Sequence, residues 1–526
     1  MDGQTVSDIR LANIAESVNL FQETLGDGSS ARQMLRSISG SSLLLKLNDR
    51  KCRGIFEASR GADGMPVLFA VFGNELFVIH KNDSGEYYST KIYASLTNID
   101  TPVSMCETGG EGSAHPHLIV VDGANVIAVN TELSDEDMQA NIRSIALPYR
   151  IRQDDKEHPS QRIVPTHCAY AYNYLIVNDA GTDAFYISYQ YPFERDAGVS
   201  SPVDYDIFMI NSTRPTEAGY KDYGFVTYSE WSPDNVTALC SNGTLLYTFG
   251  PKSTQIFTYN SDVDAPFTSP TNAANSIGIK AVHSLASIGD YTFFLGSSDI
   301  GENGIYFWNR NNLTKCSTPD IERKIGNMRN ASDAAGQCWT ENGHMFYAIT
   351  FFEDDFTYVF DIVEQAWHRR SSKAVKTNTH HYWRLMFAQL HDNKLIFGTE
   401  DGNLVYLNSK KFTEYDDRAM IRVRRSGMLI NNHNDFCVDA IRLFCNTGDF
   451  DDVNIVPKVM MRYSESGGAW SNQEMGLMGA EGRYDYEVEW FTLGMHNCMC
   501  IEFSCSDPVN FCILNAKIQY CIIDSF

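Results

Sequence analysis

Short apolar runs alternate with polar turns along most of the chain, and the clearest case lies between residues 343 and 370. Residues 345–352 are aromatic and β-branched, residues 353–355 make an acidic turn, and residues 356–362 alternate large apolar with small or polar side chains. Two such runs around a tight polar loop predict a β-hairpin. One hairpin cannot bury its apolar face alone, so further units of the same kind are expected.

The same pattern recurs at a spacing of about 50–60 residues, which is typical of propeller blades of four strands each. The other six predicted hairpins cover residues 67–79, 117–129, 174–188, 236–249, 291–308 and 394–407. Stacked β-sandwiches would give a similar pattern, but these hairpins continue without a linker. We therefore predict an all-β fold with a β-propeller of six or seven blades.

Residues beyond 420 show longer alternating strands with glycine-rich turns, which predict an additional C-terminal β-sandwich-like domain. Near the start, residues 11–25 favour one helical turn or an extended arm, and residues 31–36 favour a short helix. We predict three parts: an N-terminal arm at 1–50 that packs on the C-terminal domain, the propeller at 51–410, and the C-terminal β domain at 411–526.

Charge argues against one class of function. The 526 residues include 66 acidic and 42 basic side chains, a net charge of −24, whereas proteins that grip nucleic acid show a basic footprint. An acidic chain can still let DNA slide past without adhesion. The 13 cysteines are irregularly spaced and no apolar signal-peptide core is present, so we expect reduced thiols in a cytosolic setting.

Candidate chemistry is sparse. The common nucleotide-binding, nucleophile-elbow and zinc-protease motifs do not occur. Two histidine pairs, His115 with His117 and His380 with His381, lack further ligands at metal-binding spacing, and we expect them to be solvated.

The last predicted strands hold five cysteines that we expect to be core thiols: Cys498, Cys500, Cys505, Cys512 and Cys521. Four acidic groups, at residues 262–264, 353–355, 414–417 and 449–452, lack the spacing of a calcium loop. We therefore predict no catalytic, cofactor-binding or metal-binding residues.

A family resemblance is spread over most of the chain, and the stretches that carry it include VNLFQE at residues 18–23, the block at residues 343–370, and Leu493-Gly494. In their order they resemble the packaged-DNA stabilisation proteins of short-tailed phages, the tail hub or nozzle family. The corresponding family patterns are V-N-L-Y-x-E, G-H-x-F-Y-x-L-T-F … T-W-x-Y-D … W-H-E-R, and L-G followed by a basic residue. Here Tyr358 replaces the Trp, and Met495 follows Gly494.

The resemblance implies a structural virion protein without an active site. Proteins of this family form a ring, usually sixfold, below the portal and adaptor proteins, and the ring extends the DNA channel and helps retain the genome until ejection. The implied neighbours are tail fibre, spike or needle proteins, with double-stranded DNA passing through without specific binding. The implied location is the virion tail, assembled in the host cytoplasm. An acidic wall suits such a conduit, because it repels phosphate.

Five arginines are candidate interface residues: Arg422, Arg424 and Arg425 in a predicted strand, and Arg369 and Arg370 after Trp367. Closed rings use head-to-tail interfaces, and a basic strand in an acidic protein can dock an acidic neighbour. The alternative is a solvated edge strand whose charges discourage aggregation. We expect Trp367 to be buried and the two arginines after it to be available at the surface.

Two other functions remain open from the sequence. A glycan-binding or glycan-cleaving propeller, acting as a phage receptor-binding or depolymerase protein, needs an aromatic platform or two carboxylates about 5–10 Å apart. A cytosolic scaffold of the WD or kelch type shows repeated Trp-Asp or Gly-Gly dipeptides, which this sequence lacks.

Overall fold

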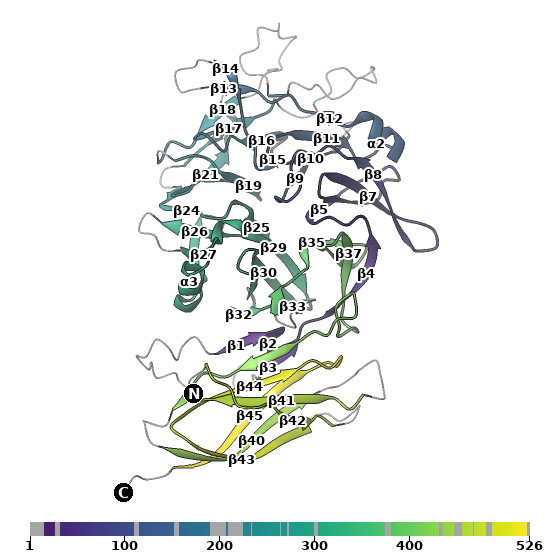
Figure 1. Cartoon of the computed structure of the whole chain (residues 1–526). Coiled ribbons are helices and arrows are strands. Elements are labelled where there is room, and N and C mark those ends of the chain that lie inside the picture. Colours follow the sequence, from purple (N-terminus) through teal and green to yellow (C-terminus); the bar gives the residue numbers. More distant parts are fainter. Residues whose placement is uncertain are drawn as a thin grey trace. The chain divides into compact units, whose positions relative to one another are not determined.

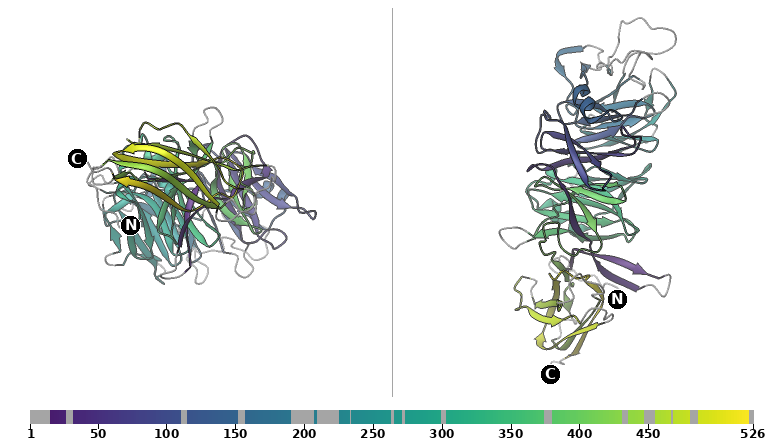
Figure 2. Two further views of the ribbon diagram at one scale, coloured as in Figure 1. Left: turned by 90° about the horizontal axis from the view of Figure 1, so that it is seen from below. Right: turned by 90° about the vertical axis from the view of Figure 1, so that its right-hand side faces the viewer.

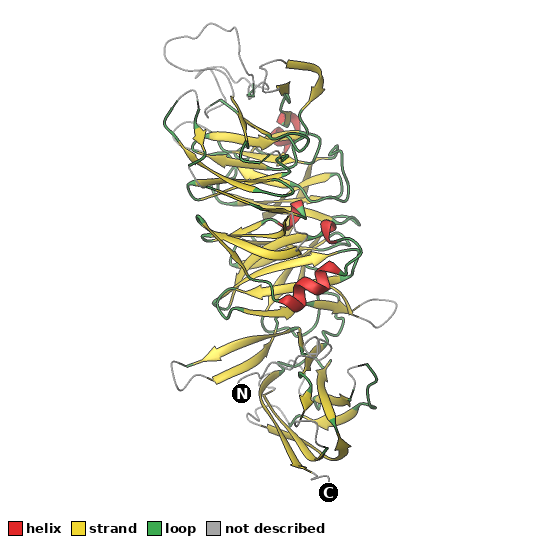
Figure 3. Ribbon diagram, turned by 90° about the vertical axis from the view of Figure 1, so that its left-hand side faces the viewer, coloured by secondary structure: helices red, strands yellow, loops and turns green. Residues whose placement is uncertain are grey.

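The computed structural model describes residues 15–26, 32–109, 115–151, 157–189, 207–208, 225–232, 234–262, 265–270, 273–298, 303–373, 380–430, 435–446, 455–465, 468–479 and 486–522. Strands dominate these ranges and helices are few, as Figure 3 shows. The chain divides into two compact units. The first unit comprises Met1–Leu43, Thr340–Arg384 and Val405–Phe526, and the second comprises Leu44–Trp339 and Leu385–Leu404.

The described residues hold seven antiparallel groups of strands of the blade type, labelled in Figure 1. Blade 1 contains β5 (Cys52–Ala58), β6 (Val67–Phe72), β7 (Glu75–Lys81) and β8 (Tyr87–Tyr93). Blade 2 contains β9 (Ser104–Glu107), β10 (His117–Val121), β11 (Val126–Asn130) and β12 (Arg143–Ser144). Blade 3 contains β15 (Cys168–Ala171), β16 (Tyr174–Asn178), β17 (Ala184–Ile187) and β18 (Phe225–Tyr228). Blade 4 contains β19 (Ala238–Asn242), β20 (Leu245–Phe249), β21 (Thr254–Tyr259), β22 (Phe267–Thr268) and β23 (Ala274–Asn275).

Blade 5 contains β24 (Ile277–Ile279), β25 (Ala286–Ile288), β26 (Tyr291–Ser298), β27 (Asn303–Asn309) and β28 (Asn312–Lys315). Blade 6 contains β29 (Ala335–Glu341), β30 (His344–Phe351), β31 (Phe356–Asp361) and β32 (Ala366–Arg369). Blade 7 contains β35 (Met386–His391), β36 (Lys394–Gly398), β37 (Asn403–Asn408) and β4 (Gly40–Lys46). Two small hairpins pair β13 (Tyr149–Ile151) with β14 (Glu157–Arg162) and β33 (Ser371–Lys373) with β34 (His380–Tyr382). All seven predicted hairpins are present as paired strands, and the β-propeller is confirmed.

The central blade strands are buried on both faces, which explains why they are continuous apolar runs rather than strict alternations. In the second unit, each of the larger cores draws on two successive blades. Phe69 of β6 shares a core with Val120 of β10, and Ile119 of β10 shares the next core with Leu175 of β16. Blade-on-blade packing therefore buries the face that a lone hairpin would expose.

One strand of blade 7 comes from far earlier in the chain. β4 pairs with β37, so a strand that precedes blade 1 completes the last blade. Just after β4, Leu47 donates its backbone N–H to the carbonyl oxygen of Gly402 at 2.9 Å. The predicted propeller begins at residue 51 and so leaves out this strand, which the prediction assigns to the N-terminal arm. That boundary and the one at residue 410 stay a prediction.

Within the described residues, two short α-helices pack against blade strands. α2 (Asp135–Asn141) begins at Ser134, whose hydroxyl accepts a hydrogen bond from the backbone N–H of Asp137. α3 (Pro319–Gly326) has proline in its first turn and buries Ile321 and Ile325.

The predicted helix at residues 31–36 is wrong, because the described part forms a strand, β3 (Arg32–Ser37), paired with β2 (Leu20–Leu25). Residue 31 and residues 11–14 lie outside the described residues; from residue 15 the arm is extended. Pairing with β2 and with the C-terminal domain overrides the weak local preference for helix.

The C-terminal domain consists of β38 (Arg422–Arg425), β39 (Leu429–Ile430), β40 (Phe436–Asn446), β41 (Lys458–Ser464), β42 (Glu474–Leu477), β43 (Tyr486–His496), β44 (Cys498–Cys505) and β45 (Cys512–Ile522). Its strands, green to yellow in Figure 2, form two sheets. One has the order β2-β3-β45-β40-β43, and the other contains β38-β44-β41-β42. Side chains such as Ile441, Met461 and Ile501 from both sheets share one core, which confirms the sandwich-like domain.

A short N-terminal strand joins blade 6 to this domain within the first unit. β1 (Glu16–Val18) runs parallel to β32 and antiparallel to β38, giving the strand order β29-β30-β31-β32-β1-β38-β44-β41-β42. β38 therefore lies between two strands, and the alternative of a solvated edge strand is wrong. We call the contact region of β1, β2, β32 and β38 the junction.

Candidate functional site

Asn19 forms the buried corner of the junction. It follows β1 with a positive φ of 55°, a conformation that asparagine adopts more readily than most residues. Its Oδ1 accepts a hydrogen bond from the backbone N–H of Ser371 at 2.9 Å. Its Nδ2 donates to the carbonyl oxygens of Ser371 at 2.9 Å and Ile421 at 2.8 Å. A single side chain thus satisfies three backbone groups from two distant segments.

The aromatic part of the N-terminal motif packs on blade 6. The ring centroid of Phe21 lies 5.2 Å from that of His344 and 6.2 Å from that of His368. His344 Nδ1 is 2.7 Å from Asp361 Oδ2, and both groups are buried. Burial also holds the pKa of His368 well below its usual range, so this imidazole is neutral at pH 7. Two of the stretches that carry the family resemblance, residues 18–23 and 343–370, are therefore in contact although they are far apart in the sequence.

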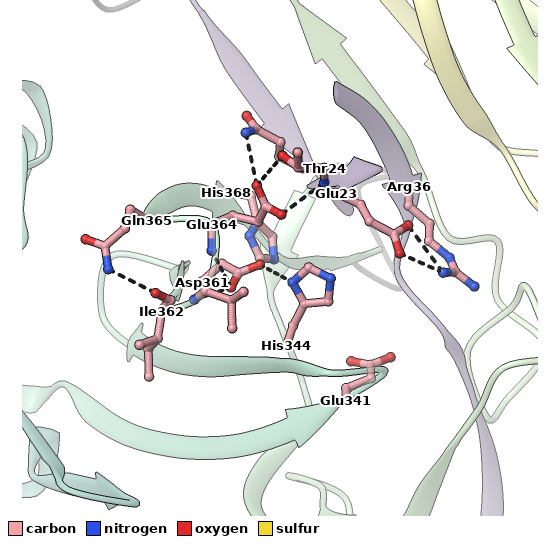
Figure 4. A network of polar contacts seen from close by, with 12 residues as sticks. Glu23, Thr24, Arg36, Glu341, His344, Asp361, Ile362, Glu364, Gln365 and His368 are labelled. Atoms are coloured by element: carbon pink, nitrogen blue, oxygen red, sulfur yellow. Dashed lines mark hydrogen bonds and ion pairs between the residues drawn. The ribbon is translucent and has the colours of Figure 1, made fainter. Parts of the chain in front are cut away.

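A carboxylate in the turn before β32 fixes the position of β2, as Figure 4 shows. Glu364 accepts hydrogen bonds from the backbone N–H of Thr24 at 3.0 Å and its hydroxyl at 2.7 Å. The Gln22 amide donates to the same carboxylate at 3.4 Å. The turn itself is held by Asp361 Oδ1, which accepts from the backbone N–H groups of Val363 and Glu364.

The burial predicted for the end of the 343–370 block is wrong, because a different side chain of this segment is the fully buried one. Trp367 is only half-buried, against Phe360 at a centroid distance of 4.9 Å, whereas Arg370 is fully buried. The Arg370 guanidinium lies 4.8 Å from the ring of Trp383 and 3.3 Å from a carboxylate oxygen of Glu341. Successive side chains point to opposite faces of a strand, so burial of Arg370 on one face places Trp367 on the other.

Arg422 and Arg425 are also used inside the chain. Arg422 is fully buried and donates to the backbone carbonyl oxygens of Asp507 and Val509 at 2.8 and 3.1 Å. Arg425 donates through Nη2 to Glu502 Oε2 at 2.7 Å. Arg369 lies 3.2 Å from Glu16. These predicted interface arginines therefore already have anionic or carbonyl partners within the first unit.

Glu502 is the centre of a row of charges across three strands. In register, it stands opposite Arg425 of β38 on one side and Arg462 of β41 on the other. Arg462 Nε donates to Glu502 Oε1 at 2.6 Å, and the carboxylate is only 3% exposed. Both guanidinium groups also lie over the ring of Trp470, at 5.1 and 4.8 Å. No feature of the sequence alone gives this register, so neither Glu502 nor Arg462 was predicted.

Arg424 differs from the other four arginines, since it forms no ion pair within the described part of the chain. Its Nη1 donates to the Ser17 hydroxyl at 2.8 Å, and burial lowers its pKa. It lines a pocket of about 290 Å³ between the sheets of the first unit. Apolar walls include Trp367 and Phe503, and Gln22 adds a polar group. The arrangement offers one desolvated cation that forms no ion pair, because the Asp361 carboxylate that also lines the pocket is bound to His344.

The remaining candidates lie elsewhere. His117 was expected to be solvated, but it is buried, and burial lowers its pKa to about 4. His380 is half-buried, with Nδ1 2.8 Å from the Ser371 hydroxyl. Of the five C-terminal cysteines, three are buried in the core: Cys500, Cys505 and Cys512. Cys498 is half-buried, and Cys521 is exposed, contrary to expectation. The acidic residues 263–264 and 449–452 lie outside the described residues.

The fold defines a class: an all-β protein that combines a β-propeller with a β-sandwich-like domain. Residues 218–411 match a family model described as Phage_stabilise, "Bacteriophage P22 Gp10, beta-propeller". This match confirms the resemblance to the packaged-DNA stabilisation family of phages, and it supports a structural component of the virion. A structural family also favours a role without catalysis. Among the described residues, no helix is long and apolar enough to cross a bilayer.

No curated protein matches the sequence. Solved structures with a related chain trace include the extracellular domain of the one component system BT4673 from B. thetaiotaomicron, at 10% identity and a TM-score of 0.39. That match covers 71% of this chain and 40% of the other. The N-terminal domain of Nup159 is 10% identical with a TM-score of 0.37, and the AfRom2 CNH domain is 9% identical with a TM-score of 0.35. Those matches cover 75% and 70% of this chain, and 99% of each of the others. These scores carry no functional argument.

Proposed function

We propose that this protein is the hub or nozzle of a short phage tail. Several copies, with six favoured, form a ring below the portal and adaptor proteins, extend the DNA channel and help retain the packaged genome until ejection. Tail fibre, spike or needle proteins are its further neighbours. The match of residues 218–411 to the phage stabilisation family is the observation that carries the proposal.

The distribution of charge supports a conduit that does not adhere to DNA. The chain has a net charge of −24. In the first unit, Arg425 and Arg462 share Glu502, and Arg369 pairs with Glu16. Because these cations are neutralised inside the chain, they offer no strong attraction to phosphate groups passing by.

The junction supports a part that has to keep its shape while DNA passes. Blade 6 and the C-terminal domain are joined through β1, which pairs with β32 at Val18 and with β38 over three residue pairs. Backbone hydrogen bonds of this pairing cannot be lost one at a time without leaving buried donors and acceptors unpaired. The first unit therefore resists bending between blade 6 and the C-terminal sheets.

We further propose that the pocket beside Arg424 receives an acidic side chain from a neighbouring copy. Of the five predicted interface arginines, Arg424 is the one whose contacts favour this role. A desolvated guanidinium without a counter-charge is costly, and a carboxylate would offset that cost. The chain is rich in carboxylates, and ring subunits meet through unlike surfaces.

Assembly state tests the main proposal. The purified full-length protein, and tails isolated from virions, would be examined by native mass spectrometry and negative-stain class averages. We expect closed rings with sixfold symmetry, and no retention of double-stranded DNA in a gel-shift assay at physiological salt. A monomer that cleaves or binds glycan, and is absent from the tail, would overturn the proposal in favour of the glycan-directed alternative.

The docking proposal has its own variant pair. Arg424→Gln should keep the unfolding temperature and weaken ring formation at least tenfold, because the cation is removed without a loss of core volume. Arg442→Gln is the matched control, since Arg442 lies on β40 and pairs with Glu487 and Glu489 of the adjacent strand. Rings of undiminished stability in Arg424→Gln would refute the docking role while leaving the hub proposal intact.

A further inference from the structure

The outer face of the C-terminal sheet brings two thiols and a carboxylate together. Cys437 of β40 stands directly opposite Cys521 of β45. The two sulfur atoms and a carboxylate oxygen of Asp439 all lie within 4.8 Å of one another. Ligand atoms of a tetrahedral zinc site are about 3.3–3.8 Å apart, given bonds of roughly 2.0–2.3 Å, so small side-chain rotations complete the geometry.

Cys437 and Asp439, two residues apart on β40, share one face of the strand, and a backbone irregularity lies beside them. The pairing of β40 with both neighbours shifts register between Val438 and Ala440, which leaves Asp439 as an unpaired bulge residue. Bulges commonly re-aim a side chain beside a functional site. On the facing strand β43, Thr492 and Gly494 have positive φ values of 59° and 95°. A β-branched residue in that conformation is a genuine outlier, which marks the bulge as a constrained feature.

No cation among the described residues neutralises this cluster. Asp439 forms no ion pair within the described residues, and Arg442, three positions further along β40, pairs with Glu487 and Glu489. Three groups that repel one another when ionised lack a neutralising cation, and a divalent metal would supply it.

The ligand types select the metal. Two thiolates and one carboxylate suit a borderline or soft divalent ion, whereas calcium and magnesium take oxygen ligands. On the other side of Cys437, directly opposite in register, stands Met495, which is 59% exposed. A thioether there adds a fourth soft group to the same face, and it occupies the position where the family pattern has a basic residue.

We propose that Cys437, Cys521 and Asp439 form a surface site for a soft divalent cation of the Zn²⁺ or Cd²⁺ type, with the fourth position open to water or to Met495. The sequence did not show this site, because Cys437 and Cys521 lie at opposite ends of the C-terminal domain, and only the pairing of β40 with β45 unites them. By holding β45 to β40, the metal would stabilise the last strand of the chain.

Cadmium is the probe that reports thiolate ligation directly. The full-length protein, reduced and freed of metal with a chelator, would be titrated with Cd²⁺ while the ultraviolet thiolate-to-metal absorption is recorded, with Zn²⁺ as competitor. We expect one tight equivalent. Cys437→Ser and Cys521→Ser should each weaken binding at least tenfold, and Asp439→Asn should weaken it several-fold. Cys498→Ser is the matched control, since that half-buried thiol instead donates to the Glu465 carbonyl oxygen and should bind as wild type.

A second measurement requires no variant. In the wild-type protein, bound Zn²⁺ should protect Cys437 and Cys521 from alkylation by iodoacetamide at least tenfold, as quantified by peptide mass, and should leave Cys498 unprotected. Equal alkylation with and without Zn²⁺ would overturn the site. A reduced protein that binds no Cd²⁺ and instead oxidises to a Cys437–Cys521 disulfide would overturn it as well, because the pair would then be a redox pair rather than a ligand set.

Discussion

Acidification should weaken the propeller through histidines that the second unit holds neutral. His167 and His117 are 7% and 3% exposed, and burial lowers their pKa values to about 3 and about 4. His167 is also stacked on His283, at a centroid distance of 5.6 Å, and the half-buried His283 faces Arg53. His117 faces His115 and Glu132. Protonation of His167 would thus place a buried charge beside His283, and protonation of His117 would place one where Glu132 offsets the cost of burial only in part.

The direction and size of this change in the free energy of unfolding follow from proton linkage. In the unfolded chain, a histidine titrates near pH 6.5, so between about pH 6.5 and 4 only the unfolded state takes up the proton. The folded state is therefore most stable above pH 6.5 and loses up to about 1.4 kcal/mol per pH unit for each such group. From pH 7 to pH 5 this amounts to about 2 kcal/mol each for His167 and His117, and less for His283, which retains solvent contact.

Urea denaturation at pH 7, 6 and 5, followed by tryptophan fluorescence, measures the effect. His167→Gln removes one titrating group, so its free energy of unfolding should fall by about 2 kcal/mol less than that of the wild type over this range. Gln139→Ala, at an exposed position of α2, changes no titrating group; it is the control and should lose stability with pH as the wild type does. If His167→Gln loses stability as steeply as the wild type, the reasoning is refuted.

Three further substitutions test the packing. Glu502→Gln leaves two arginines facing a neutral amide and should cost about 3 kcal/mol by chemical denaturation, whereas Glu474→Gln on the exposed part of β42 should change stability by less than about 0.5 kcal/mol. Gly402→Ala would place a methyl group against the Asn48 carbonyl oxygen at a φ of +84° and should cost about 3 kcal/mol or more of stability. Gly123→Ala, at a φ of +91° but in open space, is its control and should cost only about 1 kcal/mol. Equal losses of stability in the two variants would contradict the close contact at Gly402. Asn19→Ala leaves three buried backbone groups unpaired and should cost about 3–5 kcal/mol; a thermal midpoint close to that of the wild type would show that water replaces the side chain.

The hairpins could be predicted because their information is local. Each depends on two apolar runs and a turn, and the turn residues Gly73, Gly123, Gly243 and Gly402 all adopt the positive φ that such turns require. β38 could likewise be bounded from its residues alone. Strand existence therefore followed from the sequence.

Strand neighbours could not be predicted, because they depend on register and on segments far apart. β38 has an edge-like composition, but β1 covers one side of it and β44 the other. Trp367 resembles a core residue by type, yet the phase of β32 is set by Arg370, which lies just beyond it between Phe346 and Trp383. The carboxylates that neutralise the arginines, such as Glu502, become partners only once three strands align.

The junction also constrains when the chain can finish folding. Asn19 bonds to Ser371 and Ile421, which are 352 and 402 residues further along the sequence. At roughly 5–20 residues per second, the ribosome needs about 20–80 s to deliver those partners, and β1 has no strand to join during that interval. A chain that stops early leaves this segment unpaired and blade 6 with an open edge, which invites aggregation. Only completed chains form the junction, so β1 can pair only after the C-terminal domain has been synthesised.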